Sequence, residues 1–236
     1  MLIRAYLPQI LTALFGGFFV FLGISSFGNA WAFDCIYIFL LVFTGVVCKK
    51  DINVVSVIII LILQLIWENL AWNLLLDEHI VKLIFYLIAL LVTFYFRYDW
   101  LAKMVTAIVI MTSGCELYWF FNDYRAPEIY WYIWTMISNI LIRHLIFSRV
   151  SFVDRYYPNK GESVNLDWVI YKLNAVLTLL QAAMVFEYLS RHLLDFGDIL
   201  IVYHAYSYII HIIGTIIIWA IFTESSKRLI PKLLKA

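Results

Sequence analysis

Residues 54–67 read VVSVIIILILQLIW, and this stretch decides the class of protein to expect. Only Ser56 and Gln64 interrupt its apolar side chains, so a helix formed here is apolar on every side. The strands of an outer-membrane barrel would instead alternate polar and apolar residues. The apolar run extends over residues 52–76, which exceeds the ~18 residues of a membrane-spanning helix. We therefore predict a helix that crosses a lipid bilayer.

Similar apolar runs lie on both sides of this one, each bounded by charged or turn-forming residues. They predict an all-α fold: a polytopic transmembrane helical bundle with about eight spanning helices in one integral membrane domain, residues 1–236. The predicted spans are residues 10–27, 30–48, 52–76, 80–96, 101–121, 129–147, 168–189 and 199–222. We expect the cytoplasmic loop at 148–167 and the basic tail at 223–236 to lie against lipid headgroups.

Basic residues indicate which ends of the helices face the cytoplasm. Lysine and arginine accumulate in the connections that stay on the cytoplasmic side of a membrane. Of the 17 Lys and Arg residues, all but Lys82, Arg125 and Arg191 lie near the two termini or in connections that share their side. Both termini are therefore predicted to be cytoplasmic. With seven spans, the connections rich in Lys and Arg would no longer all lie on the same side of the membrane.

The composition limits the partners of the protein. Hydrophobic residues make up 64% of the chain and charged residues 14%, against roughly a quarter charged in a soluble domain. The lipid bilayer is thus the expected partner, in the cytoplasmic (inner) membrane if the chain is bacterial. A formal net charge of +1 argues against a nucleic-acid partner. Because the chain is small for a lone carrier, we expect a homo-oligomer or assembly with another membrane subunit.

The sequence predicts no cofactor, no metal site and no catalytic residue. Cys35, Cys48 and Cys115 lie in apolar segments without CxxC spacing, which is typical of packing residues. His204 and His211 are seven residues apart, about 10.5 Å along a helix, so they cannot chelate one metal ion together. The chain also lacks a P-loop and a GxSxG motif. An enzyme is therefore less favoured than a non-enzyme.

Glu68 is the strongest candidate for chemistry. It lies about eight residues, or ~12 Å, from the outer end of its predicted span, too deep for its short side chain to reach the interface. A carboxylate in the hydrocarbon costs roughly 2.5–3.5 kcal/mol, so it should face protein groups or water. Gln64 shares its helix face one turn earlier. Glu68 is either a proton- or cation-binding group in a polar cavity, or a protonated acid hydrogen-bonded between helices.

Further polar residues complete a predicted substrate or proton pathway. With Glu68, those expected between the outer rim and the middle of the bilayer are Gln64, Asn139, Gln181, His204 and His211, and Glu116 lies about one turn from its helix end. They could line one outward-facing cavity. The two histidines share a helix face and can titrate near neutral pH. Interhelical hydrogen bonds would use the same residues, so packing is the alternative to a pathway.

Three glutamates occupy related positions along the chain. Glu68, Glu116 and Glu187 each lie toward the outer end of a predicted span, twelve or thirteen residues before an isoleucine that follows an acidic segment. The acidic residues of these segments are Glu78, Glu128 and Asp198. This spacing suggests repeated helical hairpins with the same orientation, but so few positions match that chance similarity is a serious alternative. For Glu187, which is nearly at the interface, we expect a packing role.

The leading functional hypothesis is a multi-pass carrier of a small solute, an ion or protons. A non-catalytic accessory or assembly subunit of a membrane complex is a close alternative, and its polar residues should pair with one another without a cavity. An intramembrane enzyme acting on a lipid ranks last. It would need Glu68 and a histidine within hydrogen-bond reach of each other, directly or through one water.

Overall fold

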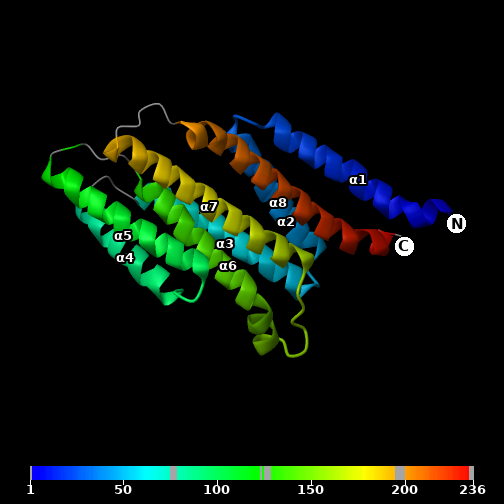
Figure 1. The fold of residues 1–236 in the computed structure, drawn as a ribbon. Coiled ribbons are helices and arrows are strands. Elements are labelled where there is room, and N and C mark those ends of the chain that lie inside the picture. The colour runs from blue at the N-terminus through cyan, green and yellow to red at the C-terminus, as the bar shows by residue number, and fades with distance from the viewer. Residues whose placement is uncertain (1, 75–78, 123, 125–128, 195–199, 234–236) are drawn as a thin grey trace. The chain divides into compact units, whose positions relative to one another are not determined.

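The computed structural model describes the chain except for residues 1, 75–78, 123, 125–128, 195–199 and 234–236. In the described part, the regular secondary structure is entirely α-helical (Figure 1). The helices are α1 (Leu2–Ser25), α2 (Ala30–Val47), α3 (Ile52–Leu74), α4 (His79–Tyr95), α5 (Trp100–Phe121), α6 (Tyr130–Tyr156), α7 (Asn165–Leu193) and α8 (Ile201–Leu233). The predicted all-α fold class is confirmed.

Several helices are longer than the apolar runs that predicted them. α1 begins at Leu2, α6 continues to Tyr156, α7 begins at Asn165 and α8 continues to Leu233. The predicted connection at 148–167 is therefore helical at both ends, and only residues 157–164 lie outside helices. Hydropathy detects the part of a helix that suits hydrocarbon, whereas a helix can continue through Ser, Arg and Lys beyond the hydrocarbon.

Five helices in the described part of the chain are long and apolar enough to cross a bilayer. Their candidate spans are Ile52–Leu70, Trp100–Phe121, Tyr130–Tyr156, Asn165–Leu193 and Ile201–Lys227. Shorter apolar helices cover Gly16–Ser25, Trp31–Val47 and Ile84–Tyr95. Together these segments characterise an integral membrane protein built from helices. The total of eight spans and the side on which the termini lie stay predictions.

The helices pack into two compact units. Unit 1 comprises residues 1–63, 145–172 and 208–236, and unit 2 comprises residues 64–144 and 173–207. Unit 1 contains α1 and α2, unit 2 contains α4 and α5, and each contains a segment of α3, α6, α7 and α8. Because these four helices continue from one unit into the other, a single membrane domain remains our prediction for the chain.

In unit 1, two glycines allow α1 to approach α8 closely. A Cβ atom added to Gly16 would lie 2.7 Å from Nε1 of Trp219, and one added to Gly23 would lie 2.8 Å from Oγ1 of Thr215. The two glycines are seven residues apart and therefore share one helix face. Lipid is as apolar as the side chains, so the hydrophobic effect does not drive helices together in a membrane. Helices associate there through close van der Waals packing, which small residues such as glycine allow.

A buried ion pair fixes the connection between α6 and α7 in unit 1. Nε and Nη2 of Arg149 donate to the two carboxylate oxygens of Asp167, at 2.8 and 2.5 Å. Nη1 donates to the backbone and side-chain oxygens of Asn53 at 3.2 Å and to Oγ of Ser56 at 3.0 Å. Nη2 also donates to the carbonyl of Glu162 at 2.8 Å. One guanidinium thus joins α3, α6, α7 and the connection.

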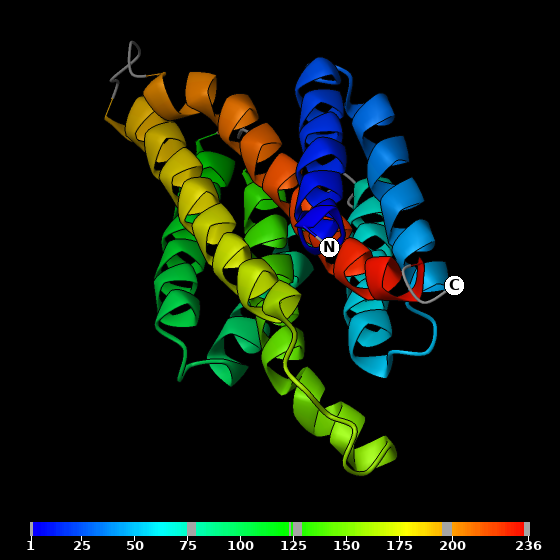
Figure 2. The same cartoon turned by 90° about the vertical axis from the view of Figure 1, so that its right-hand side faces the viewer.

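The connection runs back along the last turns of α6 to the start of α7 (Figure 2). Nδ2 of Asn53 donates to the carbonyl of Lys160 at 2.9 Å, and its Oδ1 accepts from the backbone N–H of Glu162 at 3.0 Å. A Cβ atom at Gly161 would lie 2.7 Å from the carbonyl oxygen of Val150. Glycine is therefore needed where the connection touches α6.

Unit 2 has a hydrophobic core of its own. It is built from α4, α5, α6 and α7, which contribute the fully buried residues Ala89, Val105, Ile133 and Val185 respectively. α4 and α5 pack side by side (Figures 1 and 2). Asp99 caps α5, since its carboxylate accepts from a backbone N–H in the first turn at 3.1 Å.

Candidate polar site in unit 2

The candidate site begins with a carboxylate and an amide on the unit 2 segment of α3. Nε2 of Gln64 donates to Oε1 of Glu68 at 2.9 Å. Both side chains are half-buried. Their four-residue spacing places the two groups one turn apart on the same face of the helix, as expected from the sequence. The amide therefore supplies one of the polar partners that a carboxylate in an apolar helix requires.

Asn139 and Gln181 form a second polar pair, between α6 and α7. Their side chains are only 2% and 4% exposed. Nδ2 of Asn139 donates to Oε1 of Gln181 at 2.9 Å. The side chain of Gln181 also interacts with the phenol of Tyr206 on α8. Two buried amides thus join α6 to α7, and the half-buried Tyr206 of α8 lies near Gln181.

Tyr206 relates this pair to Glu68. The carboxylate of Glu68 acts electrostatically on the Tyr206 phenol, more weakly than the other groups around it, and both residues belong to unit 2. The ring of Tyr206 packs edge-on against that of Tyr132, with a centroid separation of 5.6 Å. Sequence reasoning did not select Tyr206, because one of 16 tyrosines in an apolar chain has no distinguishing spacing. Only the tertiary structure identifies it as a member of the site.

Two tryptophans border the same part of unit 2. The indoles of Trp67 on α3 and Trp134 on α6 stack with centroids 4.6 Å apart and an angle of 18° between their planes. Nε1 of Trp67 donates to Oγ of Ser138 at 3.0 Å. Nε1 of Trp134 is buried and has no hydrogen-bond partner among the residues that the structure describes. Such a donor costs ~1–3 kcal/mol, so the Trp134 N–H favours binding of a further acceptor.

Glu116 lies at the packing interface of α4 and α5. The hydroxyl of Tyr86 on α4 donates to Oε1 of Glu116 at 3.3 Å. Tyr86 is buried and belongs to the hydrophobic core of unit 2. A buried phenol usually takes a polar partner, and here the glutamate supplies it. The hydrogen bond between Glu116 and Tyr86 therefore agrees with a packing role for Glu116 as well as with a place in the predicted pathway.

The two histidines of α8 have different surroundings. His204, in unit 2, is exposed, and its ring packs edge-on against the ring of Tyr203 at 5.6 Å. His211, in unit 1, is hydrogen-bonded through Nε2 to the backbone carbonyl of Gly23. Because a carbonyl only accepts, Nε2 carries a proton. The Phe27 ring packs against the His211 ring at 5.1 Å. His211 thus joins α8 to α1.

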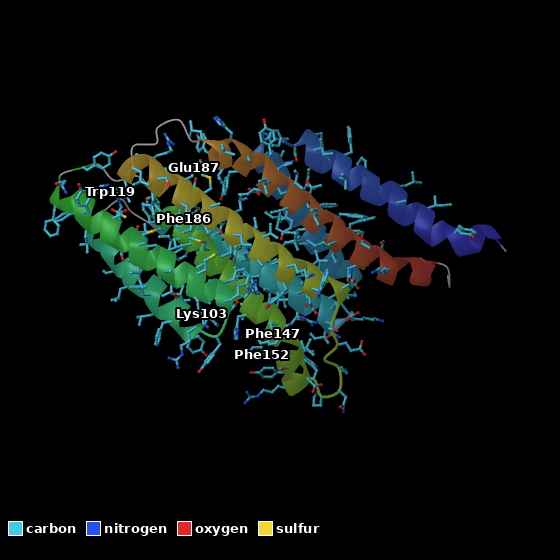
Figure 3. All side chains as sticks on the ribbon, viewed as in Figure 1. Lys103, Trp119, Phe147, Phe152, Phe186 and Glu187 are labelled. Carbon is cyan, nitrogen blue, oxygen red and sulfur yellow. The ribbon has the colours of Figure 1, made fainter. Side chains whose placement is uncertain are left out.

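Glu187 of α7 caps the start of α8 (Figure 3). Its Oε2 accepts from the backbone N–H of Val202 at 2.6 Å, and its Oε1 accepts from that of Tyr203 at 2.9 Å. The first N–H groups of a helix have no partner within the helix, and the helix dipole favours an anion beside them. This is a packing role, as expected for Glu187 from its place near the helix end.

The three glutamates with similar spacing make different contacts. Glu68 bonds with a residue of its own helix, Glu116 with the preceding helix and Glu187 with the following helix. The acidic residues that should follow them, Glu78, Glu128 and Asp198, lie outside the described residues. The predicted hairpin repeat therefore stays a prediction.

The structure places four of the seven predicted pathway residues in two hydrogen-bonded pairs of unit 2. Gln64 pairs with Glu68 and Asn139 with Gln181, and Tyr206 interacts with Gln181. The other three make separate contacts. Glu116 bonds with Tyr86, His204 packs against Tyr203, and His211 bonds with Gly23 in unit 1. No group of three His, Cys, Asp or Glu side chains within the described residues is arranged as metal ligands. A pathway through all seven stays a prediction.

The fold and the site define a class of protein: a helical membrane protein with carboxylate, amide and phenol groups among apolar side chains. No protein-family model matches the chain, and no curated protein or solved structure matches it. Chemically, a carboxyl group can take up and release a proton, and amides can donate and accept hydrogen bonds at the same time.

Proposed function

We propose that the protein carries a small solute, an ion or protons across the membrane, with Glu68 as the titratable group. The observation that carries this proposal is a half-buried carboxylate on an apolar helix, hydrogen-bonded to the Gln64 amide. Ionisable residues inside a membrane are energetically costly, and they mark substrate, ion and proton pathways in many membrane proteins.

The neighbouring side chains support a path for a polar group rather than an isolated acid. Gln181 and Asn139 continue the polar contacts from Tyr206 to α6. The N–H of Trp134 adds a buried donor without a partner in the described part of the chain. In the proposed orientation, Glu68 lies in the outer half of the membrane, and we propose that a proton or solute reaches it from the outer face.

Proton flux into liposomes tests the proposal. Purified protein is reconstituted with a trapped pH-sensitive dye, and a potassium diffusion potential drives proton entry. We expect flux above that of protein-free liposomes, and we expect Glu68→Gln to lower it at least about tenfold because the proton-binding group is lost. Helix content and thermal unfolding should be unchanged in this variant.

The control is Glu162→Gln, which removes an exposed carboxylate from the α6–α7 connection. It should retain the flux of the wild type. A Glu68→Gln variant with wild-type proton flux would exclude Glu68 as the proton-binding group. If only another ion is transported, the same variants measured with that ion test Glu68 as its binding group.

A second candidate is a non-catalytic accessory or assembly subunit of a membrane complex. The hydrogen bond between Asn139 and Gln181 favours it, because paired buried amides can hold two helices together without a bound solute. This candidate predicts no flux of protons or common ions above protein-free liposomes. It also predicts that a second membrane protein remains bound during purification in mild detergent.

A further inference from the structure

A groove in unit 1 lies between the last turns of α6 and the start of α7. Its volume is about 710 Å³, which falls within the ~300–1,000 Å³ of typical ligand pockets. Phe147 and Val150 of α6 and Trp168 and Tyr171 of α7 contribute apolar and aromatic walls. Ser163, just before α7, adds a hydroxyl group to the lining.

The buried ion pair described above holds the two walls of the groove together. Asp167 lines the groove, but its carboxylate already accepts from Arg149 and from the backbone N–H of Val164. The negative charge of Asp167 is therefore compensated within the protein. The walls are fixed by groups that do not need a ligand, so the groove is preformed.

A cation lies against Trp168, one of the residues that line this groove. Nζ of Lys172 lies 3.7 Å from the centroid of the Trp168 ring. Lys172 is exposed and makes no ion pair with the described residues. Apolar walls, with a cation that has no ion-pair partner beside Trp168, complement an amphiphile that has an acyl chain and a negative headgroup.

The sequence places the groove at the level of the lipid headgroups. Phe147 ends one predicted span and Trp168 begins the next, so both belong to the membrane interface. Their side chains are 76% and 60% exposed. At this depth large exposed aromatic side chains meet lipid, and basic pockets between helices on the cytoplasmic side bind anionic headgroups.

We propose that this groove binds one anionic phospholipid of the cytoplasmic leaflet. An acyl chain lies along Phe147, Val150 and Trp168, and the headgroup phosphate pairs with Lys172 and accepts a hydrogen bond from Ser163. The site belongs to unit 1 and does not depend on the carrier function proposed for Glu68. Its leaflet follows from the predicted cytoplasmic position of the connection between α6 and α7.

Native mass spectrometry of the delipidated full-length protein in detergent tests the charge requirement. The probes are phosphatidylglycerol and phosphatidylcholine with the same acyl chains, added in separate titrations. We expect tighter binding of phosphatidylglycerol. Lys172→Gln should weaken that binding about fivefold, the effect of one basic residue near a membrane surface, and leave phosphatidylcholine binding unchanged. Lys103→Gln removes an exposed lysine of α5 and should change neither (Figure 3).

Two phenylalanines of α6 test the apolar wall (Figure 3). Phe147 lines the groove, whereas Phe152 is exposed on the same helix and does not line it. Phe147→Ala should weaken the binding of both lipids about fivefold through lost apolar contact, and Phe152→Ala should weaken neither. Thermal unfolding in detergent should be the same for all four variants, because each changes an exposed side chain.

Two outcomes would overturn the proposal. Equal binding of both lipids by the wild type, or a Lys172→Gln variant that behaves as Lys103→Gln does, would show that the groove does not select an anion. A wild-type dimer that Phe147→Ala dissociates would assign the groove to a second copy of the chain instead of a lipid.

Discussion

Arg149 illustrates how a single cation is accommodated among apolar side chains. Its side chain is only 2% exposed, whereas most arginine side chains in proteins are exposed. All three of its guanidinium nitrogens donate to acceptors, which include both oxygens of Asp167. A charge that is desolvated on folding is stable only if such partners replace water. The buried Arg149 guanidinium therefore needs its acceptors, and the buried Asp167 carboxylate needs Arg149.

Replacement of Arg149 by Met should lower the free energy of unfolding by about 3–5 kcal/mol, because Asp167 would be left buried without its cation. Chemical unfolding in detergent micelles measures the effect. Arg155→Met, an exposed position on the same helix, should change stability by less than about 0.5 kcal/mol. The double variant Arg149→Met/Asp167→Leu should recover part of the loss. Equal stability of Arg149→Met and the wild type would contradict the buried pair.

Glu187→Ala should lower stability by about 1–2 kcal/mol, since two backbone N–H groups at the start of α8 would lose their acceptor. Hydrogen exchange provides a local readout: the amides of Val202 and Tyr203 should exchange faster. Glu187→Gln keeps one acceptor oxygen and should have a smaller effect. Unchanged exchange in the alanine variant would show that the carboxylate does not cap this helix.

Helices are the elements that the apolar runs predict well, but their contacts depend on small local features. Asn29, Asp51 and Asp99 each accept a backbone N–H at the start of a helix, at 3.1 Å. Such caps fix where a helix begins, since the first N–H groups have no other partner. Contacts between helices depend on other positions, such as Gly16 and Gly23, where a larger side chain would not fit.

Two glycines of α1 allow a comparison between a position that packs closely on α8, Gly23, and one with open space around it, Gly17. Gly23→Leu should lower stability by about 1–3 kcal/mol, because its Cβ would lie 2.8 Å from Oγ1 of Thr215. Gly17→Leu should be neutral or slightly stabilising, since nothing lies within 4 Å of its Cβ position and leucine favours the helix. Thermal unfolding of both variants in detergent checks this difference. A similar decrease in both would contradict the close approach of α1 to α8.

At the scale of the whole molecule, the distribution of Lys and Arg predicts the orientation in the membrane. Fusion of a reporter after residue 236 tests it. A fluorescent protein that folds only in the cytoplasm should be bright, and a phosphatase active only outside the cytoplasm should be inactive, because the basic ends of the helices remain inside. A fusion in the connection after α7 should give the opposite pattern. Two fusions with the same pattern would exclude an odd number of spans between them.

The membrane class and the helical segments could be predicted because lipid imposes strong local constraints. Without water in the hydrocarbon, a spanning backbone must satisfy its own hydrogen bonds, and an apolar run of ~20 residues then becomes a helix. The polar residues inside these runs could also be recognised individually, as Glu68, Gln64, Asn139 and Gln181 were. Their partners could not, since Tyr206 and Trp134 resemble many other aromatic residues in the chain.

The sequence by itself determined that this is a helical membrane protein and which segments form the apolar parts of its helices, because hydropathy is a local property. Only the tertiary structure decided that Glu187 caps α8, that His211 bonds to α1 and that Gln181 meets Asn139 and Tyr206. The physical reason is helix rotation. A segment such as 54–67 is apolar on nearly every side, so its pattern does not specify which face meets a neighbouring helix.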